Sequence, residues 1–274
     1  MPDVRIRPLS RTAEFAACVE IQRRVWGHNE LDITPVHQFC VAVHTGSILL
    51  GAFVGRDLAG YVYSFPAVFN GRTSQHSHHL AVDPSFRGAG LGKRLKWAQR
   101  EEALRRGFRL ITWTYDPMQA LNANLNLHAL GADGRTYLRN FYGDTPALVL
   151  DAGVPTDRLF LEWRIRTARV EARRRKKASP LDPSGLPAAL ERKPGGVFPD
   201  IEPRPPRLSL EAPVIRVEIP RHVASLGRGT GRIAAWQSAV RSAMEAYFRR
   251  GFCLDDFLYG DPSHYVLKRR RPSS

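Results

Sequence analysis

The sequence has few cysteines and no arrangement of them that suggests a covalent or metal framework. Its three cysteines, Cys18, Cys40 and Cys253, are widely separated, and none belongs to a C-x-x-C pair. An odd number without such a pair indicates neither a disulfide scaffold nor a zinc knuckle. We therefore expect plain buried cysteines and no bound metal.

Long apolar runs are also absent. No stretch approaches the roughly 20 apolar residues of a membrane span. The segment M-P-D-V-R-I-R lacks the charged-then-apolar order of a signal peptide. We expect no membrane segment and a cytoplasmic location. With 274 residues, 43% of them hydrophobic, the chain can bury a sizeable core in one large or two small domains.

Acidic residues are under-represented. The chain has 26 Asp and Glu against 41 Lys and Arg, a formal net charge of +15. This excess favours a polyanionic partner, which could be nucleic acid, a membrane surface or a phosphorylated cofactor. Charge alone does not choose among them.

The apolar pattern of the first 165 residues alternates between the strand and helix periods, which indicates a mixed α/β domain. Arg56-Asp57, with Gly55 beside them, predicts a hairpin turn between the second and third strands. Strands are expected at 4–9, 47–55, 58–65, 76–84, 108–117, 136–143 and 158–165, and helices at 11–26, 91–106 and 122–130.

The composition changes after residue 166. Basic and Pro/Gly-rich segments, R-R-R-K-K, P-L-D-P-S-G-L-P and P-R-P-P, predict a linker over 167–213. Strands are expected at 214–220, 252–259 and 264–269, with a helix between the first two. The apolar stripe of that helix is Ile233, Trp236, Val240, Met244 and Tyr247. We therefore predict domains at 1–166 and 214–274. The β-α-β-β order of the second domain repeats that of the first domain from its fifth strand onward, and an ordinary α+β extension is the alternative.

Three glycines in five residues, in R-G-A-G-L-G-K-R, join the fourth strand to a helix. A dinucleotide-binding G-x-G-x-x-G beginning at Gly88 would need glycine where Lys93 stands. A Walker A loop would need glycine at Arg87 and Ser or Thr at Arg94. What remains is R-x-x-G-x-G at a helix N-terminus, where backbone N–H groups and the helix dipole favour a pyrophosphate.

This segment resembles the acyl-CoA-binding motif, Q/R-x-x-G-x-G/A, of the GNAT acyltransferase superfamily. The preceding L-A-V-D-P resembles that family's fourth strand, and the element order over residues 4–165 resembles its whole fold. More narrowly, H-S-H, the D-P after the fifth strand, N-A-x-x-N and N-x-Y-G are similar to a subgroup of predicted GNAT enzymes, some of whose relatives transfer succinyl groups to amino acids.

The resemblance implies an α/β (α+β) fold with a mostly antiparallel sheet flanked by helices, extended by a half-GNAT-like β-α-β-β segment. It implies N-acyl transfer from acetyl-CoA or another acyl-CoA to a small amine or amino acid, and leaves a homodimer open. The residues expected to contact acyl-CoA are Leu80, Val82, Arg87, Gly88, Ala89, Gly90, Leu91, Gly92, Lys93 and Asn122.

Acyl transfer to an amine needs a base that takes the ammonium proton. Many GNAT enzymes place a Glu on the fourth strand, and counting back from Arg87 that position is His76. Strand alternation predicts one face for His76, His78, Leu80 and Val82, with His79 on the other face. A histidine titrates near neutrality without special burial, so we predict His76 as the base, with His78 second. Hydrogen-bonded structural histidines are the alternative.

The family's usual Tyr, which protonates the leaving thiolate, is replaced by Leu127, four residues before Gly131. We predict Tyr142 in N-F-Y-G as the substitute acid, with Tyr137 second and a buried core tyrosine as the alternative. Asn122 and Asn126, four apart on one helix face, are candidates for contacting pantetheine or substrate, with helix capping as the alternative. Weaker catalytic candidates are His128 and Asp116.

Two other classes of function stay open. A regulatory protein could keep the cofactor-binding turn without catalysis, because the usual Glu and Tyr are missing. A nucleic-acid-associated protein could use the basic run 173–177, although no aromatic residue interleaves it to stack on bases. We interpret that run primarily as a solvated segment.

Overall fold

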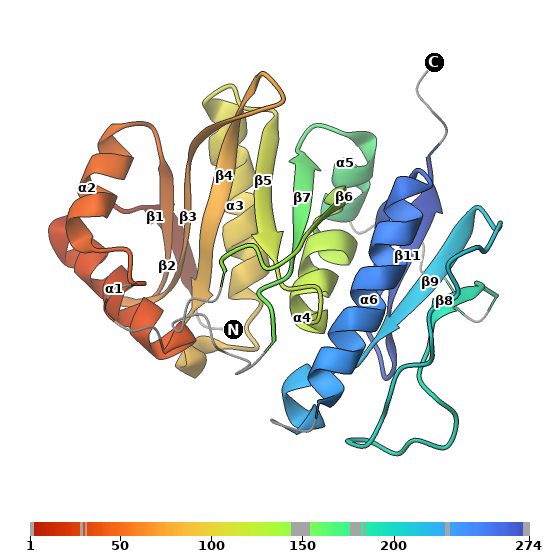
Figure 1. Cartoon of the computed structure of the whole chain (residues 1–274). Helices are drawn as coiled ribbons and strands as arrows, with labels where there is room; N and C mark the ends of the chain where they lie inside the picture. Colours follow the sequence, from red (N-terminus) through yellow and green to blue (C-terminus); the bar gives the residue numbers. More distant parts are fainter. Residues whose placement is uncertain are drawn as a thin grey trace. The chain divides into compact units, whose positions relative to one another are not determined.

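The computed structural model describes residues 3–27, 30, 32–143, 154–175, 182–183, 185–227 and 231–270 (Figure 1). The chain divides into two compact units. The first comprises residues 1–113 and 163–167, and the second 114–162 and 168–274. This division differs from the predicted domain limits of 1–166, 167–213 and 214–274, because residues 114–162 group with the C-terminal elements.

The first unit is built on a mostly antiparallel sheet in the order β1-β2-β3-β4-β5. The predicted hairpin between β2 and β3 is present, with its two-residue turn at Gly55-Arg56 instead of Arg56-Asp57. The strands are β1 (Val4–Pro8), β2 (Ile48–Val54), β3 (Asp57–Phe69), β4 (Arg72–Val82) and β5 (Leu110–Tyr115), whose last two residues belong to the second unit. The helices are α1 (Thr12–Trp26), α2 (Val36–His44), η1 (Pro84–Phe86) and α3 (Leu91–Arg105). Sequence reasoning missed α2.

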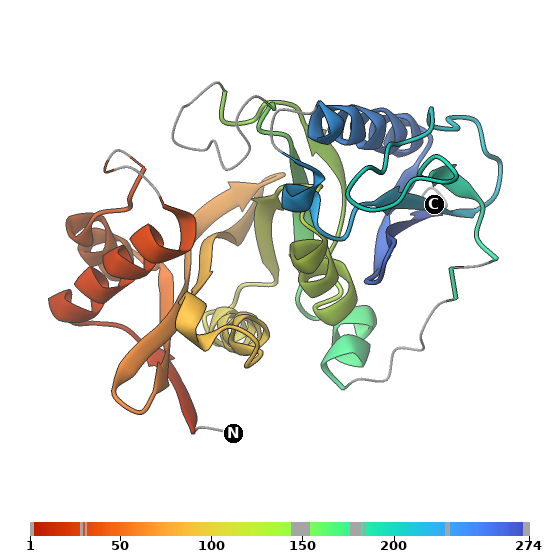
Figure 2. The same cartoon turned by 90° about the horizontal axis from the view of Figure 1, so that it is seen from below.

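Helices cover both faces of this sheet. On one face, α1 and α2 bury Phe15, Cys18 and Phe39 in a common core with Tyr61 and Ala81 of the sheet. On the other face lies α3 (Figure 2). β4 and β5 pair in parallel at only two described positions, Gln75–Ile111 and His76–Thr112. Beyond His76, the described strand pairs give β4 no partner on its β5 side.

The second unit has a sheet in the order β7-β6-β10-β11-β9-β8. Its strands are β6 (Asp133–Leu138), β7 (Arg158–Arg164), whose last two residues belong to the first unit, β8 (Ala188–Leu190), β9 (Val214–Ile219), β10 (Phe252–Leu258) and β11 (Ser263–Arg269). Its helices are α4 (Ala120–Ala123), the π-helix η2 (Asn124–Ala129), α5 (Ala168–Arg174), η4 (Val223–Leu226) and α6 (Arg232–Arg249). The C-terminal β9-α6-β10-β11 segment has the predicted β-α-β-β order, and the predicted fold class is confirmed.

The predicted stripe on α6 is buried, with Trp236, Val240, Met244 and Tyr247 at 0% exposure. Part of what covers this helix comes from the segment predicted as a linker. The indole Nε1 of Trp236 donates to the carbonyl of Ile201 at 3.1 Å, and the Tyr247 hydroxyl donates to the carbonyl of Arg207 at 2.6 Å. The linker expectation is therefore wrong for these residues, because buried polar and apolar contacts hold them to α6.

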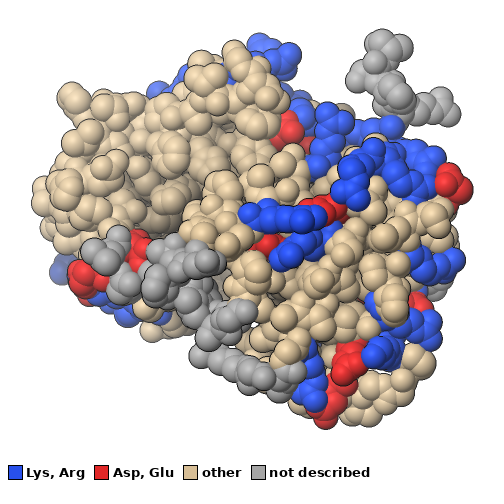
Figure 3. All heavy atoms as spheres, viewed as in Figure 1, with Lys and Arg blue, Asp and Glu red and all other residues tan. Residues whose placement is uncertain are grey.

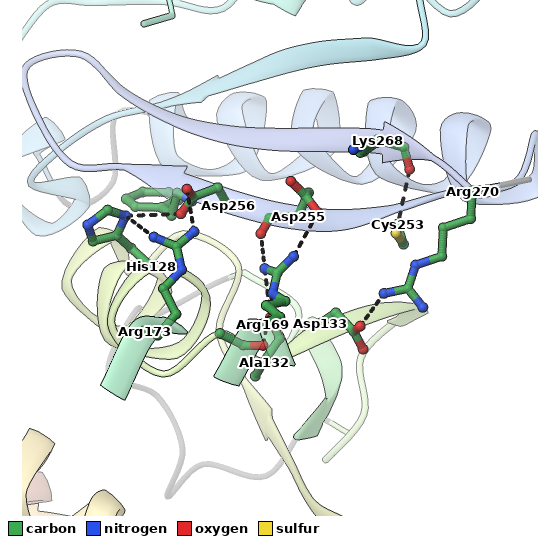
Figure 4. Close-up of polar contacts among 12 residues, drawn as sticks. His128, Ala132, Asp133, Arg169, Arg173, Cys253, Asp255, Asp256, Lys268 and Arg270 are labelled. Carbon is green, nitrogen blue, oxygen red and sulfur yellow. Dashed lines mark hydrogen bonds and ion pairs between the residues drawn. The ribbon is translucent and has the colours of Figure 1, made fainter. Parts of the chain in front are cut away.

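The start of the same predicted linker forms α5, which ion pairs attach to β10 (Figure 4). Arg169 pairs with Asp255 at 2.7 Å, and Arg173 pairs with Asp256 at 2.6 Å. The Arg173 side chain is only 11% exposed. The expectation that the basic run is solvated is therefore wrong for Arg173, while residues 176 and 177 of that run lie outside the described part.

Candidate active site

The glycine turn before α3 has an open, anion-compatible geometry. Gly88 and Gly90 have φ of +85° and +69°, a left-handed conformation that L side chains rarely adopt. A Cβ added at either glycine would meet nothing within 4 Å. Gly90 caps α3, and no acidic residue stands in the first helical turn. Backbone N–H groups and the positive end of the helix dipole therefore meet at one exposed turn.

The predicted acyl-CoA contacts of the first unit are grouped around this turn. Arg87 is exposed and Lys93 half-buried. A Cβ on Gly92 would lie 3.7 Å from Leu80 and 3.9 Å from Val82, so these β4 side chains adjoin the first turn of α3. The turn itself is held by Asp83, whose carboxylate accepts from the Ser85 N–H at 3.0 Å. The set from Leu80 to Lys93 is thus brought together.

A β-bulge interrupts the alternation of β4 at His78. Tyr63 of β3 pairs with His79, and the next residue of β3, Ser64, pairs with Ser77. His78 is therefore an extra residue that occupies no register position of its own. Side chains that follow the bulge lie on the face opposite to the one that simple counting predicts.

The bulge places the three histidines together and separates them from the two aliphatic residues. The His78 ring stacks on that of His79 at 4.3 Å, and the Phe65 ring lies 5.4 Å from His76 and 5.7 Å from His78. Leu80 and Val82 adjoin α3 on the other face. The predicted grouping of His76 and His78 with these two residues, apart from His79, is therefore wrong.

His76 lies where β4 and β5 pair, and its Nδ1 is 3.0 Å from Oγ1 of Thr112. Burial, with smaller effects from His78 and Lys96, lowers its pKa to about 4. His76 is therefore neutral at pH 7, and the assumption that it titrates near neutrality is wrong. The pKa of His78 is also lowered by desolvation, although part of its side chain stays exposed. His79 is buried, with its Nδ1 3.1 Å from the Tyr61 hydroxyl.

Sequence reasoning missed Lys96, a buried lysine on α3. Its Nζ donates to Ser77 Oγ at 3.0 Å and to Gln99 Oε1 at 2.7 Å, and it lies 4.0 Å from the centre of the Trp113 ring. Burial lowers its pKa to about 7. The sequence feature that could have indicated its burial is its spacing of three residues from Gln99, which puts both side chains on the same face of α3.

Tyr142, the predicted acid, belongs to the second unit and is exposed. β6 ends at Leu138 rather than at residue 143, so Tyr142 lies in the turn that follows, with 38% of its surface exposed. Its hydroxyl is 3.4 Å from Thr114 Oγ1, and its backbone N–H donates to Thr156 Oγ1 at 3.0 Å. The guanidinium of Arg158 lies 5.0 Å from the centre of its ring. The alternative of a core tyrosine does not apply.

Tyr137, the second candidate for the acid, is engaged in a buried network. Its hydroxyl donates to Asp157 at 2.7 Å, and the same carboxylate accepts from Arg241 of α6 at 2.7 Å and from the Asn140 N–H at 3.0 Å. Burial, followed by the charge of Asp157, raises the pKa of Tyr137 far above its ordinary value. Its proton is thus held by a structural carboxylate.

Two weaker candidates have structural partners. His128 Nδ1 is 3.0 Å from Asp256 of β10, and Asp116 accepts from the Met118 N–H at 2.8 Å. Asn122 is exposed whereas Asn126 is 6% exposed. The helix changes from α to π at residue 124. The four-residue spacing therefore does not put Asn122 and Asn126 in equally exposed positions.

Within the described residues, no group of three His, Cys, Asp or Glu side chains is arranged to hold a metal ion. The described helices include none that combines the length and apolarity needed to cross a membrane. Leu127, which replaces the usual tyrosine, is fully buried.

Comparison with known proteins agrees with this geometry. The profile of the acetyltransferase (GNAT) family matches residues 15–132, somewhat less than half of the chain. No curated protein matches the sequence significantly.

Solved structures of similar fold include several N-acetyltransferases. The ribosomal-protein-S18-alanine N-acetyltransferase from Escherichia coli is 19% identical, with a TM-score of 0.49 over 61% of this chain and 96% of that one. The aminoglycoside 6'-N-acetyltransferase from Enterococcus faecium is 17% identical, with a TM-score of 0.45 over 60% and 98%. Likenesses of this size do not identify a substrate. From the family match and the motif Arg87–Gly92, residues 15–132 belong to the acetyltransferase (GNAT) family.

Proposed function

We propose that the protein is an acyl-CoA-dependent N-acyltransferase that uses a small amine or amino acid as acceptor. The observation that carries the proposal is the turn Arg87–Lys93, in which two left-handed glycines with open space around them lead into a helix without acidic residues in its first turn. The pyrophosphate of acyl-CoA would accept hydrogen bonds from backbone N–H groups of this turn. Arg87 and Lys93 add positive charge.

The pantetheine arm is proposed to lie along β4. Beyond His76, the described pairs leave the β5 side of this strand without a partner strand, so its backbone groups are open to the amides of a ligand. Leu80 and Val82 adjoin the first turn of α3 and connect the pyrophosphate turn to this edge. The thioester would then lie near the level at which β4 and β5 separate.

The proposed chemistry is attack of a neutral amine on the thioester carbonyl, followed by release of the CoA thiolate. His76 is the proposed base because it is neutral at pH 7 and lies where the two strands separate. To accept a proton at Nε2, its Nδ1–H must donate to Thr112, 3.0 Å away. Tyr142, exposed in the second unit, is the proposed acid that protonates the thiolate. The acyl group is acetyl or succinyl.

Calorimetry with CoA tests the cofactor-binding turn. Gly90→Leu should abolish measurable CoA binding, because the side chain enters the space proposed for the pyrophosphate. Gly107→Leu is the matched control: Gly107 ends the same helix with φ +84° and also has nothing within 4 Å of an added Cβ. Both variants carry the same backbone strain, so equal CoA affinities in the two folded variants would contradict the assignment.

A protein that binds CoA without catalysis is the second candidate, favoured by the buried Leu127 at the position of the usual tyrosine. Thiol release from acetyl-CoA and succinyl-CoA with a panel of amines separates the two candidates. The nucleic-acid candidate has less support, because some of the Lys and Arg side chains shown in Figure 3 lie beside Asp and Glu. In the second unit, for example, Arg204 pairs with Glu191 and Lys193 with Glu202.

A further inference from the structure

Arg158, the first residue of β7, is a cation without a carboxylate partner among the described residues. Its side chain is half-buried, and its Nε is shielded from solvent without any hydrogen-bond partner. Among the described side chains, the guanidinium contacts the face of the Tyr142 ring, at 5.0 Å. Buried donors are nearly always satisfied, so an unpaired one indicates a partner that binds from outside.

The nearest described carboxylate in the chain does not supply that partner. Asp157, next in the chain, directs its carboxylate to Tyr137, Asn140 and Arg241. Its side chain is 0% exposed. Arg241 is therefore compensated by a carboxylate, whereas Arg158, which follows Asp157, has no such partner in the described part of the chain.

The backbone around Arg158 is fixed on both sides. Arg158 pairs with Leu138 of β6. In the turn that carries Tyr142, the Phe141 N–H donates to the carbonyl of Thr156 at 3.0 Å, and the Thr156 N–H donates to Asn140 Oδ1 at 3.1 Å. The cation and the phenol are thus presented together on a rigid base, which is what selective recognition of a small anion requires.

We propose that Arg158 binds a carboxylate of one of the two substrates, beside the Tyr142 hydroxyl. The guanidinium is a planar fork that binds carboxylates with two parallel hydrogen bonds, and the half-buried position strengthens them. The carboxylate belongs either to an amino-acid acceptor or to a succinyl group on CoA. This inference rests on the proposed N-acyltransferase function and names the chemistry of its substrate.

Steady-state kinetics with matched substrates tests the site and distinguishes the two sources. One arm compares an amino acid with its amide as acceptor, using acetyl-CoA. The other arm compares succinyl-CoA with acetyl-CoA, using an uncharged amine. In one of these arms, Arg158→Gln should lower kcat/KM for the carboxylate substrate about 10- to 100-fold, as expected for charge-assisted hydrogen bonds, and change that of its uncharged partner less than about threefold.

Two variants control for the charge and for the geometry. Arg135→Gln removes an exposed arginine from the neighbouring strand β6 and should leave both ratios unchanged. Arg158→Lys keeps the charge without the fork and should restore only part of the preference. Calorimetry should give unchanged affinity of Arg158→Gln for CoA.

Failure of this inference differs from failure of the proposed function. A wild-type enzyme that turns over carboxylate and uncharged substrates equally well in both arms overturns the carboxylate site and leaves the N-acyltransferase standing. An equal loss in Arg158→Gln and Arg135→Gln overturns the site as well. A wild-type protein that releases no CoA with any pair overturns the proposed function, and the inference with it.

Discussion

Replacement of Lys96 by methionine should stabilise the protein at neutral pH and remove part of its pH dependence. The lysine is 2% exposed, yet it carries an ionisable group between Ser77, Gln99 and the Trp113 ring. Methionine fills a similar volume. Ser77 and Gln99 keep a partner, because the Gln99 amide donates to Ser77 Oγ at 3.1 Å.

The magnitude follows from the pKa of Lys96. Burial lowers this pKa from 10.5 to about 7, a difference worth about 5 kcal/mol at about 1.4 kcal/mol per unit. Because the pKa is lower in the folded state, the unfolded chain binds more protons between pH 7 and 10.5, and stability rises with pH there. For this one group, the free energy of unfolding should rise by about 2 kcal/mol between pH 7 and 9.

Urea unfolding of wild type and Lys96→Met at several pH values measures this effect. Four of the five tryptophans lie in the first unit, so their fluorescence reports on its unfolding. The variant should be up to about 3 kcal/mol more stable than wild type at pH 7, since apolar replacement of a buried charge is often favourable. Its advantage should decrease by about 2 kcal/mol toward pH 9. Parallel stability curves over this range would show that Lys96 does not titrate as a buried group.

Three further outcomes are expected. Wild-type kcat/KM should stay constant down to about pH 5 and fall near pH 4, the pKa of His76, and His76→Gln should lower turnover by about 10²- to 10⁴-fold at unchanged CoA affinity; a fall near pH 6.5 would exclude His76. Arg241→Met should cost about 3 kcal/mol in urea unfolding because it leaves Asp157 buried and unpaired, whereas Glu245→Gln, on an exposed pair of the same helix, should cost less than about 1 kcal/mol; equal losses would contradict this. Burial lowers the pKa of His264 to about 4, so its contribution to stability is complete above pH 6.5 and is lost as the pH falls through 4; His264→Gln should flatten that fall, and an unchanged fall would refute it.

Local patterns predicted much of the fold. The hairpin at Gly55, the glycine turn before α3 and the stripe on α6 each depend on residues within one or two turns of chain, where the geometry of the backbone leaves few choices. The same locality explains why the family motif at Arg87–Gly92 could be recognised. Helix α2 was missed because V-H-Q-F-C-V-A-V-H reads equally well as an apolar strand or helix.

The sequence does not predict on which face of the sheet each β4 side chain lies, because a bulge within a polar stretch does not change the apolar pattern. In an amphipathic strand, an inserted residue shifts the apolar period and becomes visible in the sequence. The run S-Q-H-S-H-H has no apolar residue to record such a shift. The partner strand supplies the missing information, since Tyr63 and Ser64 pair with residues two apart on β4. Only the pairing therefore reveals that His76, His78 and His79 share a face.

The contacts of the segment 167–213 could not be predicted for a related reason. Composition describes a segment by itself, whereas the residues that contact this segment lie far away in the sequence. Arg173 reads as part of a basic solvated run until Asp256, more than 80 residues later, pairs with it, and Arg169 of the same segment pairs with Asp255 (Figure 4). The segment F-C-L-D-D-F-L-Y contains two adjacent acidic residues inside an otherwise apolar strand. The strand's own sequence does not explain why they are there. The basic residues of α5 and the acidic pair of β10 explain each other, since buried carboxylates in a strand require cations that pair with them. Unpaired charges inside otherwise apolar elements are thus the feature to match across a sequence. By the same reasoning Arg158, whose Nε has no hydrogen-bond partner among the described residues, is the residue from which we infer an external anion.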